Sequence, residues 1–255
     1  MAKAIADLQT KKKNFDMLIE IVDARCPHIS SNHELLQSFN LPVLTIAVKQ
    51  DLAVVDNSFL NISTNDKKAR NLILNRIKQE LKPKIDKAKS KGLLNPQFNI
   101  LVLGLPNIGK SSFINLLLNK NNLIVQNYPG VTRKQTLVKI DNMLFLNDSP
   151  GILFKNIDDD TTGYILSLIG CIKKEVVPMY EVIKFAYEFY CNKYPNQIKQ
   201  KFELNEFGNF EHFLENVCKK YQFILNGNTL DKERALEYLY SMFMNGRICK
   251  VNYEN

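Results

Sequence analysis

Asn99-Ile-Leu-Val-Leu-Gly-Leu-Pro-Asn-Ile-Gly-Lys-Ser-Ser112 is the stretch of the chain that decides its fold. Within it lies the P-loop pattern G-x-x-x-x-G-K-S, formed by Gly104, Gly109, Lys110 and Ser111. The apolar residues 100–103 predict a buried parallel strand, and residues 111–119 predict the helix that follows it. Glycines in such a turn bring backbone N–H groups close to phosphate oxygens, and the helix N-terminus adds partial positive charge. The stretch therefore predicts a nucleotide phosphate site.

The side chains of this loop have separate expected roles. We expect Lys110 to reach the β- and γ-phosphates and Ser111 to hold Mg²⁺. The residues expected to line the phosphate site are Asn107, Ile108, Gly109, Lys110, Ser111 and Ser112. A chance match inside an ordinary loop is the alternative, and the strand and helix predicted on either side argue against it.

Length and composition place the chain among soluble globular proteins. Its 255 residues can bury one large core or two modest ones. No apolar run approaches the roughly 20 residues that cross a bilayer, and the charged start lacks the apolar core of a signal peptide. The five cysteines are scattered without a C-x-x-C pair, which argues against a zinc site or a disulfide framework. A reducing compartment is therefore expected, namely the cytoplasm, or an organelle matrix if the source is eukaryotic.

Most of the net charge of +8 lies in one segment. Residues 64–91 carry ten basic residues against Asp66, Glu80 and Asp86, and ten minus three gives an excess of +7. The basic residues are Lys67, Lys68, Arg70, Arg76, Lys78, Lys82, Lys84, Lys87, Lys89 and Lys91. A solvated helix face and a footprint for a polyanion such as RNA both account for such a run, and the sequence leaves both open.

Strands and helices alternate through the first 160 residues. Strands are predicted at 17–22, 42–48, 59–62, 100–103, 134–140 and 143–147, and the last two are joined by a turn at residues 141–142. Helices are predicted at 2–13 and 32–39 and over the basic segment, which is interrupted at Pro83. Such alternation predicts a doubly wound α/β sheet, with the residues after each strand meeting at one edge. We therefore expect an α/β domain over residues 1–160.

After about residue 160 the pattern changes. Apolar residues recur at helical spacing over residues 161–171, 175–192, 209–223 and 231–245, and no strand pattern appears before the last few residues. We therefore expect an all-helical second domain over residues 161–255. Its aromatic residues favour core packing, while stacking on RNA bases stays open. They include Tyr180, Phe185, Tyr187, Phe189 and Tyr190.

Two short motifs after the P-loop carry further phosphate chemistry. Asp148-Ser-Pro-Gly151 follows a strand and has the D-x-x-G form. We expect Asp148 to hold Mg²⁺ through water and the Gly151 N–H to contact the γ-phosphate. Tyr128-Pro-Gly-Val-Thr132 lies between the P-loop helix and that strand, and Thr132 is placed to give Mg²⁺ a second hydroxyl ligand. Each motif alone is common, but their order after a P-loop predicts a GTPase.

The base-reading motif N-K-x-D does not follow this set and occurs upstream, with one change, as Val48-Lys-Gln-Asp51. Asp51 can accept hydrogen bonds from guanine N1–H and N2–H, a donor pair that adenine lacks, and the stem of Lys49 can stack over the base. Ser63 and Thr64 follow the next strand, where the last base-contacting loop is expected. Base motifs thus precede phosphate motifs, which is the order of a circularly permuted GTPase. That order is physically allowed because every motif lies at the same sheet edge.

The order and identity of these motifs resemble the circularly permuted GTPases of the ribosome biogenesis GTPase A group and their mitochondrial ribosome-associated relatives. The resemblance covers nearly the whole chain and includes the stretches Asp23-Ala-Arg-Cys-Pro27, Leu168-Ile-Gly-Cys-Ile-Lys173 and Phe243-Met-Asn-Gly-Arg-Ile248. It implies a GTP-binding and GTP-hydrolysing factor that acts on the large ribosomal subunit in late assembly. It also implies that the helical domain helps to hold ribosomal RNA. We expect a monomer.

Two departures from the family pattern bear on activity. Val48 stands where the family has an Asn that contacts guanine N7 and braces the P-loop. The hydrogen bonds lost are worth about 0.5–1.5 kcal/mol each, so weaker guanine selectivity is expected, while Asp51 keeps the more discriminating contact. Ile152 follows Gly151 where Ras-like enzymes carry a water-orienting Gln. The resemblance implies that a His just before the opening Met-Ala-Lys-Ala does this work in relatives. His28 and His33 match no such motif, and we expect both to be surface-loop residues. Slow turnover without a ribosomal partner is therefore expected.

By the same resemblance, Asn107 corresponds to the Asn that coordinates potassium in potassium-activated relatives. The expected ions are therefore Mg²⁺ and K⁺, and the expected catalytic residues are Lys110, Thr132 and Asn107. Two other classes stay open. One is a nucleotide-dependent RNA- or ribosome-binding module whose hydrolysis is vestigial. The other is a P-loop ATPase or kinase, against which Asp51 and the permuted order argue.

Overall fold

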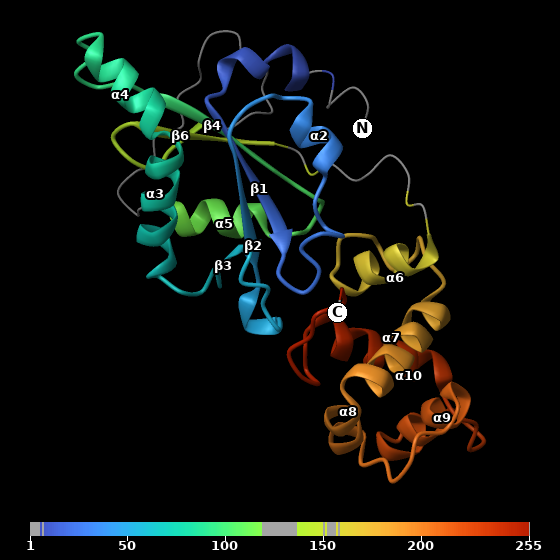
Figure 1. Cartoon of the computed structure of the whole chain (residues 1–255). Helices are drawn as coiled ribbons and strands as arrows, with labels where there is room; N and C mark the ends of the chain where they lie inside the picture. The colour runs from blue at the N-terminus through green and yellow to red at the C-terminus, as the bar shows by residue number, and fades with distance from the viewer. Residues whose placement is uncertain are drawn as a thin grey trace. The chain divides into compact units, whose positions relative to one another are not determined.

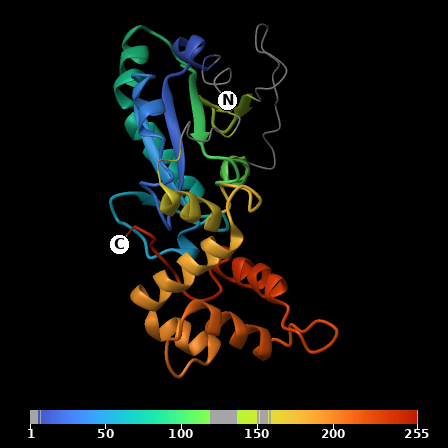
Figure 2. The ribbon, with the colours of Figure 1, turned by 90° about the vertical axis from the view of Figure 1, so that its right-hand side faces the viewer.

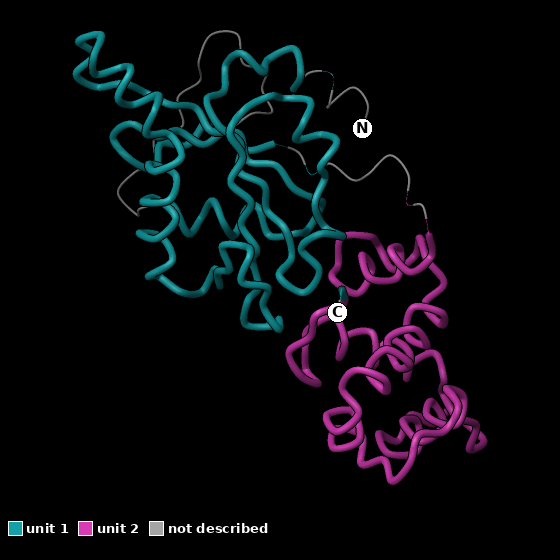
Figure 3. The backbone as a smooth tube through the Cα atoms, in the orientation of Figure 1, with its two compact units in different colours: residues 1–155, 254 teal, residues 156–253, 255 magenta. Residues whose placement is uncertain are grey.

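The structure is a computed structural model that describes residues 6, 8–118, 137–149, 151, 157 and 159–254. The chain divides into two compact units (Figure 3). The first comprises residues 1–155 with Glu254, and the second comprises residues 156–253 with Asn255. No helix in the described part of the chain is long and apolar enough to cross a membrane.

A six-stranded sheet with the order β3-β2-β1-β4-β6-β5 forms the centre of the first unit, counted over the described residues. The strands are β1 (Met17–Asp23), β2 (Val43–Val48), β3 (Leu60–Asn61), β4 (Phe98–Gly104), β5 (Leu137–Lys139) and β6 (Leu144–Asp148). β5 pairs antiparallel with β6, whereas the pairs that join β3, β2, β1, β4 and β6 are parallel. All seven residues of β1 are buried, as expected for a parallel strand covered on both faces.

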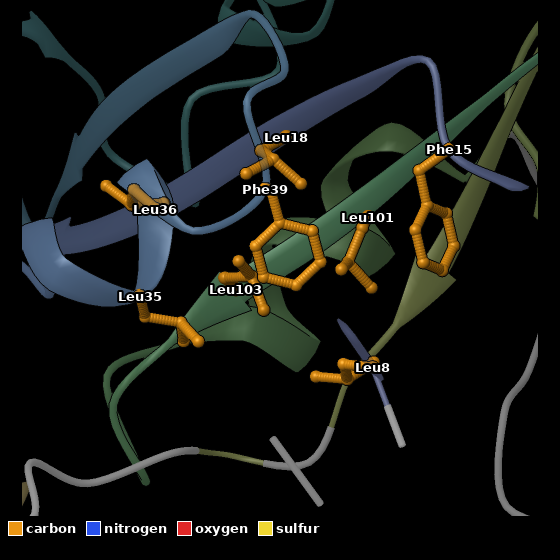
Figure 4. Close-up of a cluster of buried hydrophobic side chains, with 8 residues drawn as sticks. All are labelled: Leu8, Phe15, Leu18, Leu35, Leu36, Phe39, Leu101 and Leu103. Carbon is orange, nitrogen blue, oxygen red and sulfur yellow. The ribbon is translucent and has the colours of Figure 1, made fainter. Parts of the chain in front are cut away.

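Helices cover both faces of this sheet (Figure 1). They are α2 (His33–Gln37), α3 (Ala69–Glu80), α4 (Lys82–Ser90) and α5 (Lys110–Leu117), with short 3₁₀ turns at η1 (Lys12–Asn14) and η2 (Gln50–Leu52). On one face, Leu35 and Leu36 of α2 pack with Leu18 of β1 and with Leu101 and Leu103 of β4 (Figure 4). α3 and α5 lie on the other side of the sheet, and each buries an apolar stripe.

The predicted strands are all present, with ends that differ by one or a few residues. β3 is shorter than predicted, and residues 134–136 lie outside the described residues. Residues 6 and 8–10 of the predicted first helix are helical. The break in the basic segment falls at Leu81 rather than at Pro83, because Pro83 sits in the first turn of α4, where its missing N–H costs no helical hydrogen bond.

The second unit is helical, with α6 (Asp160–Leu168), α7 (Met179–Lys193), α8 (Pro195–Phe202), α9 (Phe210–Lys220) and α10 (Lys232–Met244). α7 packs against α6, α8, α9 and α10 (Figure 2). Its buried Tyr187 stacks on Phe213 with ring centroids 4.3 Å apart, and Tyr190 packs 5.1 Å from Phe243. The prediction of aromatic core packing is therefore confirmed at Tyr187 and Tyr190.

Candidate functional site

The predicted motifs of the first unit lie at the carboxyl ends of parallel strands. Asp23 ends β1, Val48 ends β2, Gly104 ends β4 and Asp148 ends β6. The strand register places Asp23 beside Val48, and Asp148 beside Val102, two residues before Gly104. Because parallel strands end at one edge, the base motif and the phosphate motifs meet there despite their separation in the sequence. This edge is the candidate site.

The P-loop closes around the ammonium of its own lysine. Lys110 is buried, and its Nζ donates to the carbonyls of Leu105 at 2.8 Å and Gly104 at 3.1 Å. A Cβ on Gly104 would lie 2.7 Å from the carbonyl oxygen of Ile21, so only glycine fits there. Asn107 has a left-handed φ of 56°, which asparagine tolerates. Ile108 is buried, whereas Asn107, Ser111 and Ser112 are exposed.

Gly151 lies directly against this loop. A Cβ added to it would sit 2.7 Å from Pro106 Cα and 3.1 Å from Lys110 Nζ. The D-x-x-G glycine and the P-loop lysine are therefore neighbours, and a larger residue at position 151 would push on backbone rather than on a flexible side chain. A phosphate held by Lys110 would have the Gly151 backbone close by.

Asp148 is a half-buried carboxylate with an unmatched oxygen. Its Oδ1 is buried and has no hydrogen-bond partner among the described residues. Burial raises the pKa of Asp148, and the positive charge of Lys110 offsets only part of that rise. Such an oxygen is costly unless a donor or a cation meets it.

These residues fit a Mg²⁺ ion, which takes oxygen ligands and keeps several of them as water and substrate phosphate. Asp148 offers the unmatched oxygen, and Ser111 offers a hydroxyl at the start of α5. The described residues contain no group of three or more His, Cys, Asp or Glu side chains able to hold a metal by themselves.

The base motif turns sharply after β2. Lys49 adopts a left-handed conformation with φ 62° and ψ 36°, and Asp51 follows as an exposed residue. The Gln50 N–H donates to the Ile62 carbonyl at 3.2 Å, which ties this loop to the loop at residues 63–64. Ser63 and Thr64 are half-buried. The structure thus brings together the two loops predicted to read the base.

The side chain of Val48 lies near Gly109 of the P-loop. Its side chain is fully buried, and a Cβ on Gly109 would lie 3.6 Å from Val48 Cγ2. An Asn at this position could donate hydrogen bonds to the loop, whereas Val packs against it without any. Val48 therefore keeps an apolar side chain beside the P-loop, but it lacks the hydrogen bonds that an Asn at this position could donate.

Asp23 and Arg25 are site residues whose role the sequence did not reveal. The fully buried Asp23 carboxylate accepts Arg25 Nε and Nη2, both at 2.9 Å, and Lys49 Nζ at 2.9 Å. Burial raises the pKa of Asp23, but the charges of Arg25 and Lys49 outweigh it and hold the pKa at about 2. The signal available in the sequence was an acid at the end of a predicted strand; its place beside Val48 follows from the register between β1 and β2.

Some predicted residues lie apart from this edge or beyond the described residues. Thr132 and residues 128–131 are outside the described residues, so the second hydroxyl ligand stays a prediction; Ile152 is outside them too. His33 is exposed at the first position of α2. His28 is exposed in the loop after β1, with Nε2 3.9 Å from Asp56 Oδ2. Both histidines are exposed, as expected, but only His28 lies in a loop, because His33 begins α2.

The sheet edge and the order of its loops define the class of the protein. A P-loop, a D-x-x-G glycine and a base loop meet at one edge, and the base loop comes first in the chain. The protein is therefore a P-loop GTPase with circularly permuted motifs.

Comparisons with known proteins identify the family. Residues 99–208 match the family model described as 50S ribosome-binding GTPase. The chain is 37% identical to the probable ribosome biogenesis GTPase A of Mycoplasma pneumoniae, over all of this chain and 93% of that protein. It is 30% identical to ribosome biogenesis GTPase A of Priestia megaterium, over all of this chain and 94% of that protein. The chain belongs to the ribosome biogenesis GTPase A family.

A solved structure supports the fold. The crystal structure of GNP-bound YlqF from T. maritima superposes with a TM-score of 0.66. The alignment covers 98% of this chain and 97% of that chain at 20% sequence identity. This likeness extends through the helical part of the chain as well as the sheet.

Proposed function

We propose that this protein binds and hydrolyses GTP to act as an assembly factor for the large ribosomal subunit. The observation that carries the proposal is the meeting of Lys110, Gly151 and the Lys49–Asp51 loop at one sheet edge. Relatives named for ribosome biogenesis, matched over the whole chain, support the ribosomal role.

The phosphates of GTP are proposed to bind along residues 107–112. The Lys110 ammonium, which lies inside the loop, neutralises charge on the β- and γ-phosphates. Water attacks the γ-phosphorus in line, the bond to the β–γ bridging oxygen breaks, and GDP and inorganic phosphate leave. The backbone of Gly151 lies beside the Lys110 ammonium, since a Cβ added to Gly151 would be 3.1 Å from Lys110 Nζ, and this position suits a backbone contact to the γ-phosphate.

The proposed ions are Mg²⁺ and K⁺. Asp148 and Ser111 would hold Mg²⁺, together with Thr132, and Asn107 would contribute to a K⁺ site. The ions supply positive charge at the phosphate oxygens where negative charge develops. The unmatched Oδ1 of Asp148 is the observation that favours a cation here.

Guanine is the proposed base. Asp51 is exposed at the end of the loop that the Gln50–Ile62 hydrogen bond ties to residues 63–64. Its two carboxylate oxygens accept the N1–H and N2–H donors of guanine. Because Val48 adds no hydrogen bond, we propose that Asp51 carries most of the discrimination against adenine.

Ribosomal RNA is the proposed macromolecular partner, and the basic segment is one proposed contact. Four of its ten basic residues form hydrogen bonds or ion pairs with other residues of the protein. Arg70 donates to the carbonyls of Leu117 and Ile140 at 3.1 and 3.0 Å, and Lys84 donates to Asp16. Arg76 pairs with Glu80, and Lys78 pairs with Asp141. Arg70 and Lys84 are thus held by hydrogen bonds, whereas Arg76 and Lys78 form ion pairs close to the surface.

The other six basic residues are exposed and have no ion-pair partner among the described residues: Lys67, Lys68, Lys82, Lys87, Lys89 and Lys91. Four of them lie on or next to α4, a nine-residue helix whose buried residue is Ile85. A helix that buries so little and carries so much charge favours phosphate binding over packing. We propose that the protein works as a monomer in the cytoplasm, in contact with RNA.

The proposed function is tested by GTP turnover with purified ribosomal particles. Turnover should be slow for the protein alone and should rise when large subunits are added, but not when small subunits are added. Lys110→Ala should abolish turnover in both conditions. Equal turnover with and without large subunits would contradict the ribosomal role, while GTP hydrolysis itself would still stand.

A further inference from the structure

The carboxylate of Asp23 is shared between a fixed arginine and the lysine of the base motif. Arg25 binds both of its oxygens, through Nε to Oδ1 and Nη2 to Oδ2, each at 2.9 Å. The Arg25 backbone N–H also donates to Oδ1 at 3.1 Å. Lys49 Nζ donates to Oδ2 at 2.9 Å. Asp23 and Arg25 are almost wholly buried, whereas the Lys49 side chain is 27% exposed.

This arrangement fixes one end of Lys49 and leaves its stem accessible. A bidentate arginine holds a carboxylate in one orientation, and Arg25 is itself held by burial. Oδ2 of Asp23 therefore points at a constant place, and Lys49 Nζ is anchored there. The four-carbon stem between this anchor and the left-handed backbone of residue 49 has little freedom left.

A lysine that reads a base must lie flat over it, and ordering a free lysine upon binding would reduce affinity. In this chain the neighbouring position offers no polar help, because the side chain of Val48 has no hydrogen-bonding group. The ion pair with Asp23 is a source of that order that the structure shows directly, with Lys49 Nζ 2.9 Å from Asp23 Oδ2.

We propose that Asp23 is the positioning residue of the guanine site: locked by Arg25, it holds Lys49 in the orientation that covers the base. The proposal rests on the guanine site proposed at residues 48–51. It assigns to the Asp23–Arg25 pair a part in base selectivity, acting through Lys49 without touching the nucleotide.

A purely structural role is the competing explanation, because Asp23 also closes the turn after β1. Its backbone N–H donates to Ser30 Oγ at 2.9 Å, and Ser30 Oγ donates to the Cys26 carbonyl at 2.7 Å. These two bonds use no carboxylate atom, and the third bond of the turn, from the Arg25 N–H to Asp23 Oδ1, can be kept by the amide oxygen of Asp23→Asn. The two roles are separated by asking whether the effect of Asp23 requires Lys49.

The test is a double-mutant cycle on nucleotide affinity. Dissociation constants for GDP and ADP are measured with Mg²⁺ for the wild type, Asp23→Asn, Lys49→Met and the double variant. Each single variant should weaken GDP binding by about tenfold, the worth of one hydrogen bond to a charged group. The double variant should bind GDP no more weakly than Lys49→Met, because the ammonium that Asp23 holds is already absent.

Glu20→Gln is the matched control. Glu20 is a second buried carboxylate on β1, and it accepts from Ser31 Oγ, the Asn32 N–H and Thr45 Oγ1, all outside the base loop. The Glu20→Gln variant should be less stable than the wild type, but its ratio of ADP to GDP dissociation constants should be unchanged. If Asp23→Asn fails to fold, Lys49→Arg replaces it: this variant keeps a partner for Asp23 and should bind GDP better than Lys49→Met.

Four results would overturn the proposal. The first three are additive losses in the double variant, an Asp23→Asn variant with the wild-type ratio of ADP to GDP dissociation constants, and a Glu20→Gln variant that loses selectivity to the same extent. The fourth is equal GDP affinity for Lys49→Arg and Lys49→Met. By contrast, a wild-type protein that does not prefer GDP to ADP would contradict the proposed guanine site itself, so the two failures are distinguishable.

Discussion

Two aspartates at the same sheet edge are used in opposite ways. Asp23 is saturated by Arg25 and Lys49, and its pKa is held at about 2 despite burial. Asp148 keeps a buried oxygen without a partner among the described residues, and burial raises its pKa. A saturated carboxylate organises its neighbours, whereas an unsatisfied one is available to a ligand.

This contrast predicts the behaviour of Asp148→Asn. The change removes a poorly solvated charge, so the free energy of unfolding without ligand should be unchanged or higher by about 1 kcal/mol. Binding of GTP should lose its dependence on Mg²⁺. Thermal unfolding and GTP titrations with Mg²⁺ or with a chelator measure the two effects. Lower stability together with intact Mg²⁺ dependence would show that Asp148 is structural.

The low pKa of Asp23 makes a prediction about acid stability. A carboxyl group ionised more readily in the folded state stabilises it above the unfolded-state pKa, and this contribution disappears as pH falls through the folded-state pKa. For Asp23 the window runs from its ordinary value of 3.8 down to about 2. The difference in unfolding free energy between wild type and Asp23→Asn should therefore be constant at neutral pH and shrink within that window. Urea unfolding at a series of pH values would measure it, and a constant difference down to pH 2 would contradict the assignment.

At the scale of elements, the close packing of residue 151 against the P-loop makes a glycine substitution informative. In Gly151→Ala the new Cβ would lie 2.7 Å from the backbone of Pro106 and must displace one of the two segments. An overpacking cost of about 1–3 kcal/mol should weaken binding of a GTP analogue by about tenfold or more. GDP affinity should change less, because the affected contact is the proposed γ-phosphate contact. Nucleotide titrations measure the ratio, and an unchanged ratio would argue against that contact.

Gly163→Ala provides the control for this substitution. Gly163 lies in α6, and a Cβ there would have its nearest neighbours at 3.8 and 3.9 Å, an ordinary packing distance. Alanine in a helix interior should raise stability by about 0.5–1 kcal/mol and leave nucleotide binding unchanged.

The helix α4 carries a prediction about RNA. Lys87→Glu with Lys89→Glu reverses two exposed charges that have no ion-pair partner among the described residues. Binding to large subunits should weaken, and its log–log salt slope should fall by up to about 0.9 for each lost phosphate contact. Lys12→Glu with Lys13→Glu changes exposed charge equally on η1 and should have little effect. Co-sedimentation with large subunits at several salt concentrations measures both the affinity and the salt slope. Equal losses of affinity for the two double variants would show that net charge, and not the position of α4, accounts for the effect.

At the scale of the whole molecule, the sequence predicted the sheet and its permuted motifs because their signals are local. Parallel strands that are buried on both faces read as apolar runs, and the P-loop follows one of them directly. α8 was not predicted: it has eight residues and begins at Pro195, so its pattern is short. In the basic segment, composition could not separate Lys84, which contacts Asp16, from the exposed Lys87.

The contacts of Asp23 were also beyond sequence reasoning. They depend on the register between β1 and β2, which puts residues 23 and 48 side by side although 25 positions separate them. Likewise, the approach of Gly151 to Lys110 depends on how β6 pairs with β4. Local patterns identified the candidate residues, and tertiary packing decided which of them touch.

The central claim is that the loop at residues 48–51 reads the base of the nucleotide whose phosphates lie in the P-loop. Asp51→Asn tests it most directly, because the amide keeps one acceptor for N1–H but replaces the acceptor for guanine N2–H by a donor, which suits the C2 carbonyl of xanthine. Calorimetric titration should show GDP binding weakened roughly tenfold to a hundredfold and xanthosine diphosphate binding gained. If Asp51→Asn keeps the wild-type preference for GDP and does not gain xanthosine diphosphate, the two motifs do not form one site.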